Sequence, residues 1–462
     1  MKKSFFKWMP LLGTMLCCTV PVFGQSQLEI FKNPVRQAVQ YNKEIQNTIL
    51  TNQKTALDRE DLKGKLLPTV SANAMYGYVN TGLNLDLPTQ TLPFTGLNLF
   101  EGSTNGNMSS QIAIGGLTAT QVIFSGLQIS NGLKALEQKY KAQNLLAEAS
   151  YDQIAQDVLS SFDQLMLLKE VDLLIDDSEK RLNREHLKVI KAIENGVAIP
   201  YDRDKIKLAM LELESKREEV KSGRELLYFR LQEITGMPME SLHDIAYTLQ
   251  PLDLDENSFV MNRKELQALE ASGEAYKYVL KKEQGAKLPM VFAFVNASYI
   301  NAFDTRMTVK DLPLLDDLKF RSNHLQLAPS FAIGVGAKWT IFEGNTHKIA
   351  IEKAKLDLQI NENKLKDTKD KLSLLQRKTK SDYLLFNKKL GINEQQMTIA
   401  KNNLILASRQ FEEGLLDVTE RLQAENEFYK QSLSYFNQVL NQRQAASEVL
   451  KSNGNLYQTI IQ

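Results

Sequence analysis

The chain has 462 residues, and 43% of them are hydrophobic, which is enough apolar material for a folded protein and excludes disorder as its main state. The chain contains 56 lysines and arginines against 55 aspartates and glutamates, so it lacks the excess positive charge that is typical of nucleic-acid-binding proteins. Only 12 prolines and 23 glycines are present, and the long stretches rich in Leu, Lys, Glu, Gln and Ala predict a mostly helical protein.

Residues 1–24 have the pattern of a secretory signal peptide. A lysine-rich start precedes an apolar stretch from Met9 to Val20, and Gly24 provides a small residue before the expected cleavage point. The apolar stretch is shorter than the ~20 residues that a membrane-spanning helix needs, which favours cleavage over anchoring. Both cysteines, Cys17 and Cys18, lie inside this leader, so we expect a mature chain without thiols or disulfides.

The remaining sequence contains two similar halves. Three landmarks recur about 220 residues apart: Leu67–Val70 returns as Leu288–Val291, Val122–Gly126 as Thr340–Gly344, and Asn195-Gly196 as Glu413-Gly414. This recurrence predicts a tandem duplication, with a first repeat at 25–240 and a second at 241–462. Each repeat is expected to run helix, strand, loop, strand, long helix, short helix.

The predicted elements follow that order. In the first half we expect a helix over 28–64, a strand from 70 to 78, a loop over 79–108, a strand near 111–124, a long helix over 127–195 and a short helix over 199–234. In the second half the corresponding ranges are 258–286, 291–299, 300–327, 331–340, 346–412 and 416–452. The first long helix contains neither Gly nor Pro except Gly132, so ~65 residues would extend ~100 Å.

The strands alternate apolar residues with small or polar ones, as Val70, Ala72 and Ala74 do in the first strand. Such two-faced strands suit a soluble sandwich as well as a membrane barrel. Tyr76 and Trp339 at strand ends favour the membrane, where aromatic girdles mark the interfaces and ~9 to 11 residues span the bilayer. Four strands cannot close a barrel, so several chains would have to contribute strands to one barrel.

Residues suited to catalysis or cofactor binding are sparse. The four histidines are far apart in the sequence and form no metal-binding spacing, which indicates that the protein is not an enzyme and needs no cofactor or metal. Gly334 and Gly336 lie within a strand rather than at a strand-to-helix turn, so we expect them to make room for side chains of neighbouring strands.

Taken together, these motifs resemble the TolC-like family of outer-membrane factors, the exit ducts of tripartite efflux pumps and type I secretion systems. The resemblance rests on the Leu-Pro-x-Val start of the first strand in each half, the Phe-x-Gly exit into each long helix, the turns at Gly196 and Gly414, and the stretch from Phe411 to Glu425. It implies a mainly α fold with membrane β: four strands per chain in a trimeric 12-stranded outer-membrane β-barrel, and long coiled helices in a periplasmic α-helical barrel.

The resemblance also implies a function and a location. The protein would be an outer-membrane channel that extends into the periplasm of a Gram-negative cell envelope and passes drugs, other small molecules or polypeptides to the exterior. Its partners would be two further copies of itself, a periplasmic adaptor (membrane fusion) protein, an inner-membrane transporter and outer-membrane lipid.

A gate is expected where polar residues surround the two glycine turns. By resemblance, Glu420 and Gln423 occupy positions where the family often has an aspartate ring, and Asp202 and Phe411 match members of its closing contacts. Leu416 departs from the family, because it stands where an arginine helps to lock the best-known members. The candidate periplasmic constriction comprises Asp202, Glu420, Gln423, Phe411, Tyr201, Arg203, Arg421 and Asp417.

Alternatives remain open at this level. The charges around the turns also suit an ordinary solvated helix face. A periplasmic coiled-coil adaptor or scaffold without a channel would share the helices but not the membrane strands. An exported enzyme would need a set of polar catalytic residues that the sequence does not display. Drugs, secreted polypeptides and metal ions are all compatible cargoes.

Overall fold

The computed structural model describes residues 28–86, 88–100, 103–310 and 317–462, so the expected signal peptide at 1–24 lies outside the described residues. The chain divides into two compact units. The first contains the described residues up to Leu50 together with Asn144–Ala268 and Lys366–Gln462, and the second contains Thr51–Gln143 and Leu269–Leu365.

The helices follow the predicted order. They are η1 (Glu29–Phe31), α2 (Lys32–Tyr41), α3 (Lys43–Gly64), α4 (Gln128–Glu194), α5 (Pro200–Thr235), α6 (Met239–His243), η2 (Glu256–Phe259), α7 (Lys264–Gly285), α8 (Thr346–Glu412), α9 (Val418–Asn453) and α10 (Leu456–Ile461). The two long helices are confirmed, each as one helix of 67 residues. Within the described parts of the chain, none of the helices combines the length and apolarity that crossing a membrane requires.

Two short helices differ from expectation. The helix predicted over 28–64 is interrupted at Asn42, whose extended backbone (φ −61°, ψ 121°) lets its side chain accept a hydrogen bond from the Ile45 N–H at 3.0 Å. Asparagine competes for backbone groups in this way, which ends one helix and caps the next. The helix predicted from 258 begins at Lys264, after the short turn η2.

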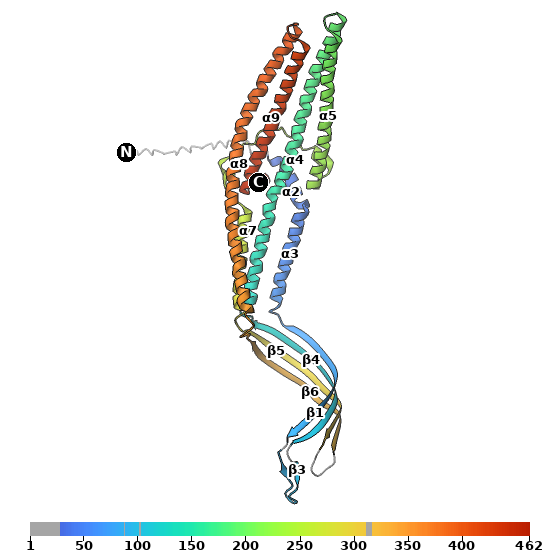
Figure 1. The fold of residues 1–462 in the computed structure, drawn as a ribbon, viewed down its shortest axis with the longest axis vertical. Helices are drawn as coiled ribbons and strands as arrows, with labels where there is room; N and C mark the ends of the chain where they lie inside the picture. Colours follow the sequence, from blue (N-terminus) through green and yellow to red (C-terminus); the bar gives the residue numbers. More distant parts are fainter. Residues whose placement is uncertain (1–27, 87, 101–102, 311–316) are drawn as a thin grey trace, which may run out of the picture. The chain divides into compact units, whose positions relative to one another are not determined.

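The second unit contains an antiparallel sheet in the order β1 (Thr69–Asp86), β4 (Ser103–Phe124), β5 (Met290–Val309) and β6 (Leu318–Lys338). Figure 1 shows these four strands as one long curved sheet. A small second sheet joins β2 (Gln90–Thr91) to β3 (Asn98–Phe100). The central pairing, β4 with β5, joins strands from the two halves of the sequence.

The predicted loops over 79–108 and 300–327 were wrong, because the strands continue through most of both segments. The four strands contain 18, 22, 20 and 21 residues, about twice the length expected from the sequence. The β1–β4 ladder runs unbroken from Thr69↔Thr120 to Asp86↔Ser103. In its outer half Val79 and Leu83 of β1 pair with Ser110 and Gly106 of β4, so the hydrophobic alternation fades although the backbone hydrogen bonds continue.

One face of the sheet is apolar and exposed in the single chain. Val70 and Tyr76 of β1 contribute to it, as do Phe331, Ile333 and Val335 of β6. The opposite face contains the two strand glycines. A Cβ atom at Gly334 would lie 2.9 Å from the ring of Phe294, and one at Gly336 would lie 2.6 Å from the ring of Phe292. Glycine therefore makes room for the neighbouring rings, as the sequence predicts.

The first unit is built around α4 and α9. α4 has an apolar seam, in which Ile154, Val158, Phe162 and Leu165 are all buried in one hydrophobic cluster. A second cluster lies nearer to the helix turns and includes Ile206 together with residues of α4 and α9. These helices therefore form a packed bundle rather than isolated coils.

A buried ion pair crosses this bundle. Arg443 Nε of α9 lies 2.9 Å from Asp163 Oδ1 of α4, and each side chain is only 1% exposed. The Tyr247 hydroxyl donates to the same carboxylate, and Arg443 Nη1 donates to the Gln250 carbonyl at 2.8 Å. Burial raises the pKa of Asp163, and the Arg443 charge opposes that rise. The segment that links the two halves is thereby fastened to α4 and α9.

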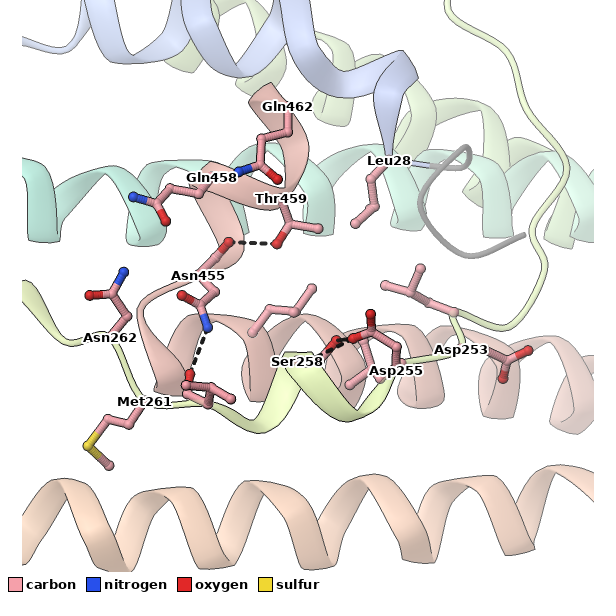
Figure 2. A pocket seen from close by; sticks show the side chains of 14 residues that line it. Leu28, Asp253, Asp255, Ser258, Met261, Asn262, Asn455, Gln458, Thr459 and Gln462 are labelled. Carbon is pink, nitrogen blue, oxygen red and sulfur yellow. Dashed lines mark hydrogen bonds between the residues drawn. The ribbon is translucent and has the colours of Figure 1, made fainter. Parts of the chain in front are cut away.

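The C-terminal helix α10 borders an open cleft of about 660 Å³ (Figure 2). Asn455 Nδ2 donates to the Val260 carbonyl at 2.8 Å, and Asp152 Oδ1 of α4 accepts from the Tyr457 N–H at 2.8 Å. Burial raises the pKa of Asp152 to about 6. The Asp152 carboxylate thus caps the first turn of α10 and docks it on α4.

Candidate gate at the helix turns

The two glycine turns of the first unit have the same local geometry. Gly196, between α4 and α5, has φ +74°, and Gly414, between α8 and α9, has φ +73°. In each turn the next residue donates its N–H five positions back, from Val197 to Ala192 and from Leu415 to Gln410, both at 2.8 Å. This closure of a helix C-terminus favours glycine because other residues are strained at positive φ.

Three of the predicted gate residues cap the helices that follow. Glu420 donates its N–H to Asp417 Oδ1 at 2.8 Å, and Glu420 Oε2 accepts from the Asp417 N–H at 3.4 Å. Asp202 has the equivalent position in α5 and accepts from the Ile199 N–H at 3.4 Å. Acidic side chains in the first helical turn also interact favourably with the helix dipole. Local helix capping therefore accounts for these three residue types at these positions.

The other predicted residues separate into exposed and packed ones. Gln423 and Tyr201 are exposed, and the ammonium of Lys205 lies 4.3 Å from the Tyr201 ring centroid. Arg203 pairs with its neighbour Asp204 at 2.8 Å. Phe411 is half-buried and packs against the hydrophobic cluster nearest the turns.

Arg421 is buried in a three-membered ionic cluster that the sequence reasoning missed. Arg421 Nη1 lies 3.0 Å from Glu425 Oε2, and Arg181 Nη2 of α4 lies 2.8 Å from Glu425 Oε1. Arg181 also donates to Ser178 at 2.9 Å and stacks over the Phe428 ring at 5.4 Å. The spacing of four between Arg421 and Glu425 was visible in the sequence, whereas Arg181 lies 244 positions from Glu425.

Two more polar contacts cross between the helix pairs near the turns. Lys188 Nζ of α4 lies 2.6 Å from Glu412 Oε1 of α8, and this hydrogen bond lowers the pKa of Glu412. Lys205 Nζ of α5 donates to Thr419 Oγ1 of α9 at 2.6 Å. With the Arg181–Glu425 pair, three links therefore join α4 and α5 to α8 and α9; we call them the inter-pair links.

Comparison with known proteins identifies the fold. No protein-family model matches the chain, and no curated protein matches its sequence. Among solved structures, the outer-membrane channel OprN matches with a TM-score of 0.71 at 13% identity, covering 94% of this chain and 92% of its own. The CmeC outer-membrane channel of Campylobacter jejuni matches with 0.67 at 14% identity, over 93% and 86%.

A third match is the open state of the MtrE outer-membrane channel of Neisseria gonorrhoeae, with a TM-score of 0.66 at 14% identity, over 94% of this chain and 91% of that one. The chain thus has the fold of these outer-membrane channels, and the resemblance to TolC-like outer-membrane factors is confirmed at the level of the fold. In the described residues no group of three or more His, Cys, Asp or Glu side chains is placed to hold a metal ion.

Proposed function

We propose that this protein is the outer-membrane exit duct of a tripartite efflux pump or type I secretion system, passing drugs, other small molecules or polypeptides from the periplasm to the exterior. The fold shared with outer-membrane channels over 94% of the chain carries this proposal. The alternative function, a periplasmic coiled-coil adaptor or scaffold without a channel, does not explain four strands of about twenty residues with an exposed apolar face.

The sheet supports a trimeric barrel. Its order begins with β1 and ends with β6, so each of these strands has one edge without a partner in the single chain. An open sheet edge is not tolerated in lipid, and three copies joined from β6 to β1 would close twelve strands. The apolar face with Val70, Tyr76 and Phe331 would then meet the outer-membrane lipid.

The helices support the same assembly. On α8 every seventh residue from Leu385 through Ile392 and Ile399 to Leu406 is apolar and about half exposed. This is the spacing of a coiled-coil seam, which needs a partner helix. A neighbouring copy supplies that partner in a homotrimer whose helices enclose the periplasmic part of the duct.

Gating would take place at the inter-pair links. In the closed state, α8 and α9 are held against α4 and α5 by Lys188–Glu412, Lys205–Thr419 and Arg181–Glu425. Opening breaks these contacts and separates the two helix pairs. A periplasmic adaptor, paired with an inner-membrane transporter, would dock on the turns. Val197 and Leu415 suit such docking, since they are 82% and 75% exposed apolar side chains.

The test is single-channel conductance of the purified protein in a planar bilayer, with a charge swap at one link. Lys188→Glu and Glu412→Lys each place like charges together, and we expect each to raise the open probability about two- to fivefold. The double swap restores opposite charges and should return the open probability to the wild-type value.

The control is Asp204→Lys, which reverses a charge at an exposed pair within α5 and should leave the open probability unchanged. Equal open probability in all variants would refute the gate while leaving the duct intact. No channel from wild-type protein, despite verified insertion, would refute the duct and favour the scaffold.

A further inference from the structure

The apolar face of the sheet ends in a row of aromatic and polar side chains. Cross-strand partners place Tyr78 opposite Gln111, Gln111 opposite Phe303, and Phe303 opposite His324. Partners in adjacent strands share a face of the sheet. We call these four residues the tyrosine row. The rings of Phe303 and His324 pack edge to face at 5.5 Å, and Tyr78 is 66% exposed.

The next row outward on β1 and β4 is different in charge. Asn80 pairs with Ser109, Ser109 with Arg306, and Arg306 with Arg321. We call these four residues the arginine row. Asn80 and Ser109 are each two residues from their counterparts in the tyrosine row, so on β1 and β4 the two rows lie on one face of the sheet.

A bulge in β5 brings Arg306 onto this face. Between the two rows β4 advances by two residues, from Gln111 to Ser109, whereas β5 advances by three, from Phe303 to Arg306. Asp304, inside the extra step, has φ +45°, which is the strained geometry of such an insertion. Without the extra residue, alternation would turn the Arg306 side chain to the opposite face.

The two arginines share one carboxylate. Arg306 Nη2 lies 2.9 Å from Asp304 Oδ2, and Arg321 Nη2 lies 3.2 Å from Asp304 Oδ1. Their side chains are 60% and 66% exposed. Lys319 is exposed two residues further along β6, so this part of β5 and β6 contains three cationic side chains and one carboxylate. The local charge is positive, and most of the guanidinium donors remain available to a ligand.

We propose that the arginine row binds the phosphate groups of lipid headgroups in the leaflet around the outer end of the sheet. This inference rests on the membrane location in the proposed function. Aromatic rings mark the level where the apolar region of a bilayer ends, and the arginine row follows immediately beyond it, at headgroup depth. Guanidinium groups bind phosphate through paired N–H donors, and two adjacent guanidiniums held by Asp304 are suited to a lipid carrying more than one phosphate.

The experiment uses the full chain purified in detergent, with bisphosphorylated lipid A as the probe and native mass spectrometry as the readout. The variant Arg306→Gln/Arg321→Gln removes both guanidiniums and keeps polar side chains. The matched control, Arg59→Gln/Arg230→Gln, removes two exposed arginines from helices α3 and α5. The same lipid without its phosphates tests the headgroup chemistry.

We expect the wild-type protein to retain the phosphorylated lipid and to retain the dephosphorylated form several-fold less. Each arginine removed from the row should weaken retention about fivefold, and the control should bind as the wild type does. Equal retention of the lipid by the wild type and the Arg306→Gln/Arg321→Gln variant, or equal retention of both lipids, would overturn the proposal.

Single-channel conductance of the same preparations separates this inference from the proposed function. Conducting channels from both the wild type and the double variant, with equal lipid retention, would refute the lipid site alone. A wild-type protein that inserts without conducting would refute the duct. A variant with reduced lipid binding and wild-type conductance supports both and shows that the variant is folded.

Discussion

Arg181 on α4 and Glu425 on α9 form a two-point ion pair: Arg181 Nη2 lies 2.8 Å and Nε lies 3.1 Å from Glu425 Oε1. The Glu425 side chain is only 4% exposed, and it also accepts from the buried Arg421. One carboxylate therefore balances two guanidiniums beside the helix turns. A buried charge that loses its partner is costly, so this residue is a sensitive point in the bundle.

Glu425→Gln should destabilise the protein by about 3 kcal/mol, because it leaves the Arg421 guanidinium buried without a countercharge. Denaturant unfolding followed by the helical circular dichroism signal measures this loss. Asp204→Asn, which removes an exposed carboxylate, should change stability by less than about 0.5 kcal/mol. Similar stability of the two variants would contradict the importance assigned to the ionic cluster.

Loss of the Asp163–Arg443 ion pair should destabilise the protein more than loss of the Tyr247 hydrogen bond to the same carboxylate. Arg443→Met leaves the fully buried Asp163 without its cation and should destabilise the protein by about 3 to 5 kcal/mol. Tyr247→Phe removes one hydrogen bond to the same carboxylate and should cost about 1 to 2 kcal/mol. Thermal unfolding of both variants tests the order. A larger loss from Tyr247→Phe would show that the hydroxyl, not the ion pair, holds the linking segment.

Docking of α10 should depend on pH through Asp152. Its pKa is raised to about 6 from the usual 3.8, mainly by burial, so the docked state binds a proton more tightly than the undocked state. Docking is therefore most stable below about pH 4, weakens as the pH rises through 6, and is constant above that. Amide hydrogen exchange at residues 456–461, corrected for intrinsic exchange rates, should report this loss.

The control for this pH dependence is Asp152→Asn, which has no titrating group and keeps an oxygen near the Tyr457 N–H. In this variant the opening free energy of α10 should be nearly flat between pH 4 and 7. A wild-type opening energy that increases with pH would contradict the assigned direction of the pKa shift.

Replacing glycine by alanine should have opposite effects on stability at a helix turn and in the middle of a helix. Gly414→Ala places a side chain at φ +73° and should destabilise the protein by about 1 to 2 kcal/mol. Gly391→Ala lies within α8, with open space at the Cβ position, and should stabilise it by about 0.5 to 1 kcal/mol. Thermal unfolding distinguishes them, and a loss at both positions would show that strain at positive φ is not the cause.

Local sequence signals predicted the helices better than the strands. The absence of helix-breaking residues defined α4 and α8, and the glycines at 196 and 414 marked their ends, because helix continuity depends on residues only a few positions apart. The outer halves of the strands were missed because their apolar residues pair with polar or small ones, so the backbone ladder continues where the hydrophobic alternation is weak.

The sequence by itself determined the long helices, their turns, the capping acids and the two-faced strands, since each depends on neighbours along the chain. Only the tertiary structure decided that Arg181 meets Glu425 and that Arg306 lies on the same face of the sheet as Tyr78 and Asn80. Those contacts join residues about two hundred positions apart, and the second also requires a bulge at Asp304 that reverses the strand's alternation. Periodicity does not encode either relationship, because both arise from how distant segments pack and pair.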